Sequence, residues 1–161
     1  MPDESSHPFV AYLQGLADDR GALAALRRGL GQPPGTVASM YPYVARWIGE
    51  QTPRWQEETY YLIASLYAWH PQPGGDGNMG DHFRRAAAKR PQAIERRFVA
   101  LLATHPEDLP DVLRQAVSLL RSEEVPINWN LLLSDLLRWS HAARYVQRRW
   151  ASRFWQTEEE N

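Results

Sequence analysis

Apolar residues recur every three or four positions along most of the chain, which is typical of helices with one buried face. Phe9, Leu13 and Leu16 form the first such stripe, and Ser5 or Ser6 would cap its helix. No segment alternates apolar and polar residues over the length of a strand, and no Asn-Gly or Asp-Gly pair lies between β-branched runs. The pattern therefore predicts an all-α protein.

Glycine, proline and hydroxyl residues divide the chain into about eight or nine predicted helices. Gly29 and Gly31 end the second helix, and Thr52-Pro53 supplies a cap and a first-turn proline for a longer one. Because short loops join these helices, we expect a compact helical bundle. In chain order, the predicted helices start near residue 6, cover 21–28, start at Thr36, run from Thr52-Pro53 toward Trp69, cover about 82–90, start at Pro91, start near Pro110, run from 125–130 to Trp139, and cover about 141–155.

The segment "HPQPGGDGNMGD", residues 70–81, is the one clear break in the pattern. Its four glycines and two prolines predict a mobile loop. Two interpretations follow. Residues 1–161 form a single helical domain with a surface loop, or the loop separates subdomains 1–70 and 81–157.

Charge is distributed unevenly, although the 161-residue chain has a formal net charge of only -1. Residues 1–80 contain 5 basic and 8 acidic side chains, whereas residues 81–157 contain 13 basic and 8 acidic side chains. Of the 18 basic residues, 17 are Arg and only Lys89 is Lys. The planar guanidinium of Arg suits phosphate recognition better than an ammonium group does. The C-terminal half is therefore the place to look for a phosphate-binding surface.

Other features exclude whole classes of function. The absence of cysteine excludes disulfides, thiol nucleophiles and thiolate zinc sites. The N-terminal "MPDESSHPF" is unlike a signal peptide, and no apolar run approaches 18 residues, so we expect a cytoplasmic protein.

Catalytic and metal-binding motifs are weak. None of the five His residues has the helical spacing of a metal site. Asp76, Asp81 and His82 are the only candidates for a cation site, and a helix N-cap in a Gly-rich loop explains them better. "PGGDGNMG" lacks the Gly-Lys-Ser/Thr of a phosphate loop. We expect no enzymatic activity, no metal and no cofactor.

Paired arginines give the stronger signal. Arg114 and Arg121 are seven residues apart, so a helix places them on one outward face with Ser118 between them. In the last helix, Ala143, Val146, Trp150 and Phe154 form the buried stripe, and "RYVQRRW" places Arg144 and Arg148 on one flank and Arg149 on the other. "IERRF" and "LRRG" leave further Arg pairs outside, at 96–97 and 27–28.

Two interpretations of these arginines are open. On most helices such residues form a solvated face, and some would pair with Glu95, Asp111 or Asp135. Because the pairs recur on three C-terminal helices, we favour a surface that binds nucleic-acid backbones without reading sequence. Trp129, Trp139, Trp150 and Trp155 would offer base stacking only if they were exposed, and helical tryptophans mostly belong to the core.

The ordered series of motifs resembles the CasB family, the small subunit of the type I-E CRISPR effector complex, Cascade. The resemblance rests on "LAALRRG", "YPYVARW", "FRRAAA", "IERRFVALLAT", "DLPDVLRQAVSLLRSEEVPINWNLLLSDLLRW" and "RYVQRRWASRFW", and covers about residues 8–156. In "INWN", Asn128 stands where the family commonly has Asp, and Asn caps a helix equally well.

The resemblance implies an all-helical, non-enzymatic subunit without cofactors. Its partners would be crRNA, target DNA, the displaced non-target strand, the large subunit CasA, the backbone subunit CasC, CasD, CasE and a second copy of itself. It would stabilise the R-loop for antiviral defence. The nucleic-acid-binding residues it assigns are Arg27, Arg28, Arg96, Arg97, Arg114, Arg121, Arg138, Arg144, Arg148 and Arg149.

Two alternatives are weighed against this function. A helical protein–protein adaptor would use the same basic face to dock acidic protein surfaces. A helix-turn-helix regulator would need several base-facing residues on one recognition helix, whereas here the arginines are spread over several helices.

Overall fold

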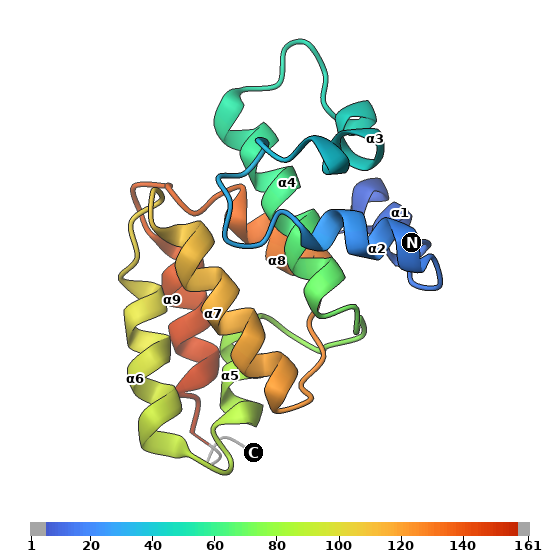
Figure 1. The fold of residues 1–161 in the computed structure, drawn as a ribbon. Helices are drawn as coiled ribbons and strands as arrows, with labels where there is room; N and C mark the ends of the chain where they lie inside the picture. The colour runs from blue at the N-terminus through green and yellow to red at the C-terminus, as the bar shows by residue number, and fades with distance from the viewer. Residues whose placement is uncertain (1–5, 158–161) are drawn as a thin grey trace.

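The computed structural model describes residues 6–157, and in this range the chain is helical without a strand (Figure 1). The predicted all-α class is confirmed. No helix of the described range is long and apolar enough to cross a membrane. The helices are α1 (Pro8–Gln14), α2 (Arg20–Arg27), α3 (Tyr41–Val44), α4 (Arg54–Trp69), α5 (Met79–Ala86), α6 (Pro91–Leu102), α7 (Leu109–Ser122), α8 (Trp129–Leu136) and α9 (Tyr145–Phe154), with 3-10 turns η1 (Ala38–Met40) and η2 (Ala45–Trp47) around α3.

Helix α4 organises the N-terminal half. Helices α2 and α8 both pack against it, and Ile63, Leu66 and Tyr67 of α4 are completely buried. The Tyr67 ring meets the Trp129 ring of α8 edge to face at 5.5 Å. A helix from the C-terminal half of the chain thus completes the packing of the N-terminal half.

Helix α9 organises the C-terminal half, with α5 packed closely along it (Figure 1). Gly80 at the start of α5 lies against the Trp150 carbonyl oxygen, where an added Cβ would overlap that oxygen. The Phe98 ring of α6 contacts Phe83 of α5 at 5.1 Å and Phe154 of α9 at 4.5 Å. These contacts fix the relative positions of α5, α6 and α9.

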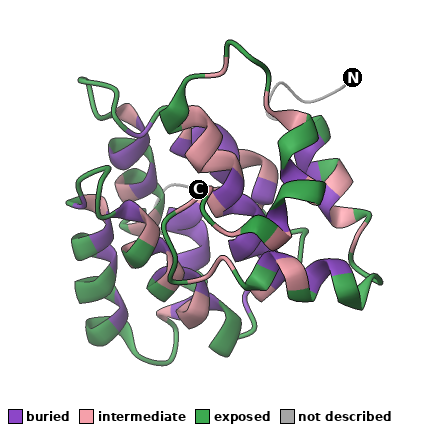
Figure 2. Cartoon of the chain, turned by 45° about the horizontal axis from the view of Figure 1, so that its top comes forward, coloured by how far each residue is buried: buried purple, intermediate pink, exposed green. Residues whose placement is uncertain are grey.

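The buried apolar residues form one continuous cluster that extends from Phe9 to Trp150. In Figure 2 the buried positions face the inside of both groups of helices, and the exposed positions lie on their outer faces. We propose on this basis that the chain forms a single domain.

The Gly-rich segment packs against the connection between α7 and α8. Ile127 N–H donates to the Gln72 carbonyl at 3.1 Å, and the His70 ring donates to the Val125 carbonyl at 2.7 Å. Gly75 is buried so tightly against residues 126–128 that a side chain there would clash with backbone. The segment predicted to be a mobile loop is therefore anchored at several points in this structure.

Four predicted helix starts are wrong. Helix α5 begins at Met79 and not near residue 82, because Asn78 caps it. The Thr36 hydroxyl donates to the Pro33 carbonyl, and the helical backbone begins only at Ala38. Thr52 accepts a hydrogen bond from Gly49 N–H instead of capping α4, whose N-cap is Pro53. The last helix begins at Tyr145 and not near residue 141. The proposed cap Ser5 lies outside the described residues, and His7 occupies the N-cap position of α1.

Candidate nucleic-acid interface

Arg144 joins the end of α6 to the start of α9. It precedes the first residue of α9 and has a left-handed backbone, with φ 51° and ψ 37°. Its Nη2 donates to the Leu102 carbonyl oxygen at 2.7 Å. Leu102 ends α6, and the final carbonyls of a helix have no partner within the helix. The prediction that Arg144 lies inside a helix is wrong because this tertiary contact holds it in the turn.

Arg148 and Arg149 lie exposed on the first turns of α9. Arg148 Nε donates to the Ala143 carbonyl at 3.3 Å, and the Arg149 guanidinium lies over the Tyr145 ring, 4.9 Å from its centroid. Both side chains therefore border the solvent on either side of the helix start. Val146 and Trp150 are buried as predicted, whereas Ala143, expected on the same stripe, is exposed because it precedes the helix.

Helix α6 runs antiparallel to α9 and places Arg96 and Arg97 on the surface. Its C-terminal end meets Arg144, and its first turns meet the end of α9, where Trp155 Nε1 donates to Glu95 Oε1 at 2.8 Å. Glu95 thus binds a tryptophan and none of the arginines. Arg96 and Arg97 are exposed, and Arg97 borders a hollow of about 120 Å³ between α6 and α7.

The five arginines of these two helices form what we call the α6/α9 basic surface: Arg96, Arg97, Arg144, Arg148 and Arg149. Among residues 6–157, no carboxylate lies within ion-pair distance of any of them. Five exposed guanidinium groups create a positive potential over this part of the molecule, although Arg149 also acts on the buried Asp135 carboxyl from beyond ion-pair distance. Half of the ten assigned arginines thus lie exposed on α6 or at the start of α9.

The arginines of α7 have a different environment. Trp69 of α4 donates through Nε1 to Ser118 Oγ at 2.9 Å, so the face predicted to point outward packs partly against α4. Arg121 stacks on the Trp69 ring, 4.1 Å from its centroid. Arg114 is half-buried beside Asp111 at 3.9 Å, and its Nε is buried without a hydrogen-bond partner. Of this pair, only Arg121 is well exposed.

The remaining three assigned arginines are exposed and lie outside α6 and α9. Arg27 ends α2 and donates through Nε to the Leu23 carbonyl at 3.2 Å, and Arg28 follows it as the C-cap. Helix α2 lies on the opposite side of the molecule from α6 (Figure 1). Arg138 follows α8 and donates to the Ser134 carbonyl at 3.4 Å. The ten arginines therefore do not form one continuous face.

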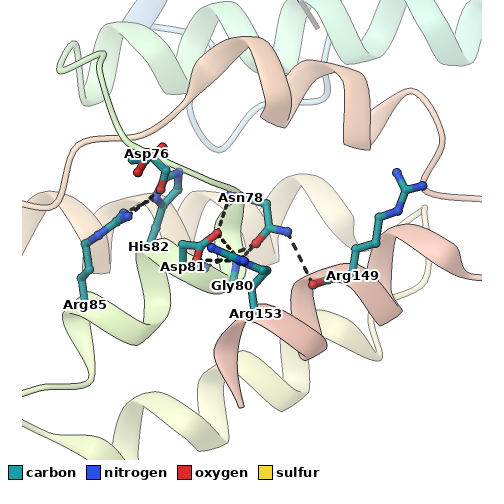
Figure 3. Close-up of polar contacts among 8 residues, drawn as sticks. All are labelled: Asp76, Asn78, Gly80, Asp81, His82, Arg85, Arg149 and Arg153. Carbon is teal, nitrogen blue, oxygen red and sulfur yellow. Dashed lines mark hydrogen bonds and ion pairs between the residues drawn. The ribbon is translucent and has the colours of Figure 1, made fainter. Parts of the chain in front are cut away.

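Arg153, which sequence reasoning did not single out, links α9 to α5. Its Nε donates to both carboxylate oxygens of Asp81, at 3.0 and 3.2 Å (Figure 3). Asp81 also accepts from Asn78 N–H at 2.9 Å, while Asn78 Oδ1 accepts from Asp81 N–H at 3.4 Å, which makes a capping box at the start of α5. Asn78 Oδ1 accepts from Gly80 N–H as well, at 2.8 Å. The prediction of an N-cap at Asp81 and His82 is wrong by three residues, because Asn78 is the N-cap of α5 and Asp81 is the third residue of the helix. No sequence pattern signals a pair 72 residues apart.

His82, the next candidate ligand, is buried, and Arg85 lies beside its ring (Figure 3). Its Nδ1 lies 3.0 Å from Arg85 Nη1, and its Nε2 lies 3.1 Å from the Asn128 backbone nitrogen. Burial, and then the neighbouring Arg85 guanidinium, lower the pKa of His82 to about 4. Asp76 contributes only its carbonyl oxygen, to Arg85 at 2.6 Å. Nowhere in residues 6–157 do three His, Asp or Glu side chains gather as a metal site would require.

The aromatic residues separate into core and surface groups. Trp129, Trp139 and Trp150 are buried, as expected of helical tryptophans, and only Trp155 of the four candidates is exposed. Trp150 Nε1 donates to Asp135 Oδ2 at 2.7 Å in the interior. Burial raises the pKa of Asp135 to about 6, against the effect of this hydrogen bond. Arg149 and Arg138 also lower the pKa of Asp135, but no arginine of the described residues lies within ion-pair distance of it.

Residues 22–155 match a protein-family model described as CRISPR-associated protein Cse2. The chain belongs to the Cse2 family. A curated Cse2 protein from Thermus thermophilus is 37% identical over 158 residues, which cover 96% of this chain and 90% of that protein. The predicted resemblance is thereby confirmed, since solved structures of the same fold carry the name CasB.

Two solved structures illustrate the similarity. CasB from Thermus thermophilus is 32% identical, with a TM-score of 0.80 over 94% of this chain and all of that one. A chain of a CRISPR RNA-guided surveillance complex is 27% identical, with a TM-score of 0.75 over 91% of this chain and 88% of that one. The helical arrangement of this Cse2-family chain is thus the arrangement of its relatives.

Proposed function

We propose that this Cse2-family chain is the non-catalytic small subunit of a type I-E Cascade complex. Its family and its similarity to a chain of an RNA-guided surveillance complex support this role. In the complex it would hold the backbones of crRNA, target DNA and displaced strand while the R-loop is open. Base pairing between guide and target reads the sequence, so the protein needs only backbone contacts.

The α6/α9 basic surface is the observation that supports the proposal most. Its five arginines are exposed and have no carboxylate partner in the described residues. The guanidinium groups of Arg144 and Arg148 are also oriented by hydrogen bonds to backbone carbonyls. Oriented guanidinium groups bind phosphate with less loss of side-chain entropy than free ones. Arg121, held on the Trp69 ring, has the same advantage.

The rest of the surface is available to protein partners. Residues 1–80 carry more acidic than basic side chains, so nucleic acid would be repelled from much of this half. We assign to these faces the contacts with a second copy and with CasA, CasC, CasD and CasE. The exceptions within this half are Arg27, Arg28 and the exposed start of α4 at Trp55, which lines a groove together with Arg138.

The proposal is tested by co-expressing the chain with its native partner subunits and a CRISPR array. The subunits and a guide RNA should co-purify, and Arg121→Ala with Arg148→Ala should leave assembly intact but shorten the lifetime of the R-loop. Arg46→Ala is the matched control, because Arg46 is exposed and contacts a tyrosine ring, as Arg149 does. Unchanged R-loop lifetimes in the double variant would contradict the site. Loss of assembly would instead favour a protein-docking role for the basic face.

A further inference from the structure

A groove of about 480 Å³ opens between the first turn of α4 and the connection from α8 to α9. It continues past Trp55, Leu136 and Ser140 into a second hollow of about 290 Å³. Trp55 is 54% exposed, more than any other large apolar side chain in the described part of the chain. An aromatic ring so exposed on the wall of a groove is a ready surface for a planar ligand. The groove is lined by Trp55, Leu136, Leu137, Arg138, Ser140 and His141.

Aromatic rings and cations lead from this groove toward Arg149 of the α6/α9 basic surface. The His141 ring on the wall meets the Tyr145 ring edge to face at 5.1 Å. The Arg149 guanidinium lies over the Tyr145 ring, 4.9 Å from the ring centroid. Arg138 stands on the groove wall beside His141. The groove is therefore connected to Arg149 by a continuous row of contacts.

The charge of the groove selects among ligands. No carboxylate lines it within the described residues. Glu58 and Glu107 line only the adjoining hollow, and Glu58 is paired with Arg54 at 3.0 Å. Arg138 uses only Nη1, toward the Ser134 carbonyl, so its other N–H groups remain for an anion. A flat apolar wall beside a cation fits a base with its phosphate, whereas the bases of a duplex present no free faces.

We propose that this groove binds one unpaired base of single-stranded nucleic acid. The base stacks on Trp55, its phosphate contacts Arg138, and the strand continues past His141 and Tyr145 to Arg149. This inference rests on the proposed function and deepens it, because it assigns a single strand to one particular path on the surface.

The test measures binding of the full chain to three fluorescein-labelled probes at fixed salt. The probes are a ten-nucleotide oligothymidine, an abasic strand of the same length and charge, and a duplex. Trp55→Ala should weaken binding of oligothymidine by about 5- to 100-fold, the usual effect of losing one stacked base, and leave the other two probes unchanged. Trp55→Phe should retain most of the affinity, since a smaller ring still stacks. Tyr41→Ala, at another exposed aromatic residue, is the control and should bind all three probes like the wild type.

The outcomes separate the two proposals. If Arg148→Ala weakens all three probes while Trp55→Ala weakens none, or weakens all equally, the groove is not a base site although the proposed function stands. If Trp55→Ala changes only the association of the chain with itself or with partner subunits, the groove is a protein interface and the inference is overturned. If no probe binds the wild type even at low salt, the proposed function fails as well.

Discussion

The Arg144 guanidinium donates a hydrogen bond to the Leu102 carbonyl oxygen over 2.7 Å, 42 residues back along the chain. This one contact ties the end of α6 to the start of α9 and keeps a cation on the surface between them. Arg144 therefore contributes both a hydrogen bond to the fold and a positive charge to the proposed binding surface. Substitutions at Arg144 can separate these two roles.

Arg144→Ala should lower the free energy of unfolding by about 1 kcal/mol, because it removes an exposed charge-assisted hydrogen bond. Arg144→Gly should be nearly neutral, since glycine accepts the left-handed backbone at no steric cost and regains about 1 kcal/mol. Both variants should weaken nucleic-acid binding equally, because both remove the same charge. Urea denaturation and an oligonucleotide titration measure the two effects, and equal stabilities of the variants would contradict the account of the turn.

Asp135 makes the stability depend on pH. Burial raises its pKa from 3.8 to about 6, so the folded state keeps the proton that the unfolded state loses first. Asp135 therefore makes its full contribution to the free energy of unfolding below pH 3.8, and this contribution is lost as the pH rises through about 6. Asp135→Asn keeps an oxygen for Trp150 Nε1 but cannot ionise. Between about pH 4 and 7 the free energy of unfolding of the wild type should fall by about 3 kcal/mol relative to that of this variant.

Denaturation curves of the wild type and Asp135→Asn from about pH 4 to 8 measure this difference. Asp111→Asn is the control, because it removes an exposed carboxylate instead of a buried one. Parallel profiles for wild type and Asp135→Asn would show that the buried carboxyl does not titrate as described.

Gly80 should tolerate no side chain. Its Cβ would overlap the Trp150 carbonyl oxygen, which belongs to helix backbone and cannot rotate away. Gly80→Ala should therefore cost about 3 kcal/mol of stability by forcing α5 and α9 apart. Gly21→Ala is the matched control, because Gly21 lies in α2 and a Cβ there meets nothing closer than 3.6 Å. It should stabilise the protein by up to about 1 kcal/mol, and thermal melts of the two variants should shift in opposite directions.

The pair of Asp81 and Arg153 gives a graded prediction. Arg153→Ala removes only an ion pair whose Arg side chain is 51% exposed, so it should cost no more than about 1 kcal/mol. Asp81→Ala also removes the acceptor of the Asn78 N–H and half of the capping box, so it should cost about 1 kcal/mol more. Chemical denaturation measures both. An equal loss in the two variants would show that the cap contributes nothing.

Much of the fold follows from local patterns. The starts of α6 at Pro91 and α7 at Leu109 agree with the sequence within a residue, because proline in the first turn and a 3.6-residue apolar period are local signals. The buried stripe of Val146 and Trp150 follows for the same reason. Local patterns fail at residues 141–144, where a hydrogen bond to Leu102 decides the backbone.

The candidate site follows from the sequence only in part. Paired arginines on α6 and α9 were expected on the surface, and they lie there because the opposite helix faces are buried. The partial burial of Arg114 and Ser118 against α4 depends on a contact with Trp69, 49 residues away from Ser118. No sequence pattern distinguished Trp55, in the first turn of α4, from the buried tryptophans, although it is 54% exposed.

The salt dependence of nucleic-acid binding tests the central claim most directly. Log affinity of the chain for single-stranded DNA should fall linearly with log salt concentration. The double variant Arg96→Ala, Arg148→Ala should bind more weakly and show a slope smaller by about 1.4, which corresponds to two lost phosphate contacts. Arg46→Ala should match the wild type. If the double variant kept the wild-type slope and affinity, the α6/α9 basic surface would not be where this Cse2-family chain holds nucleic acid.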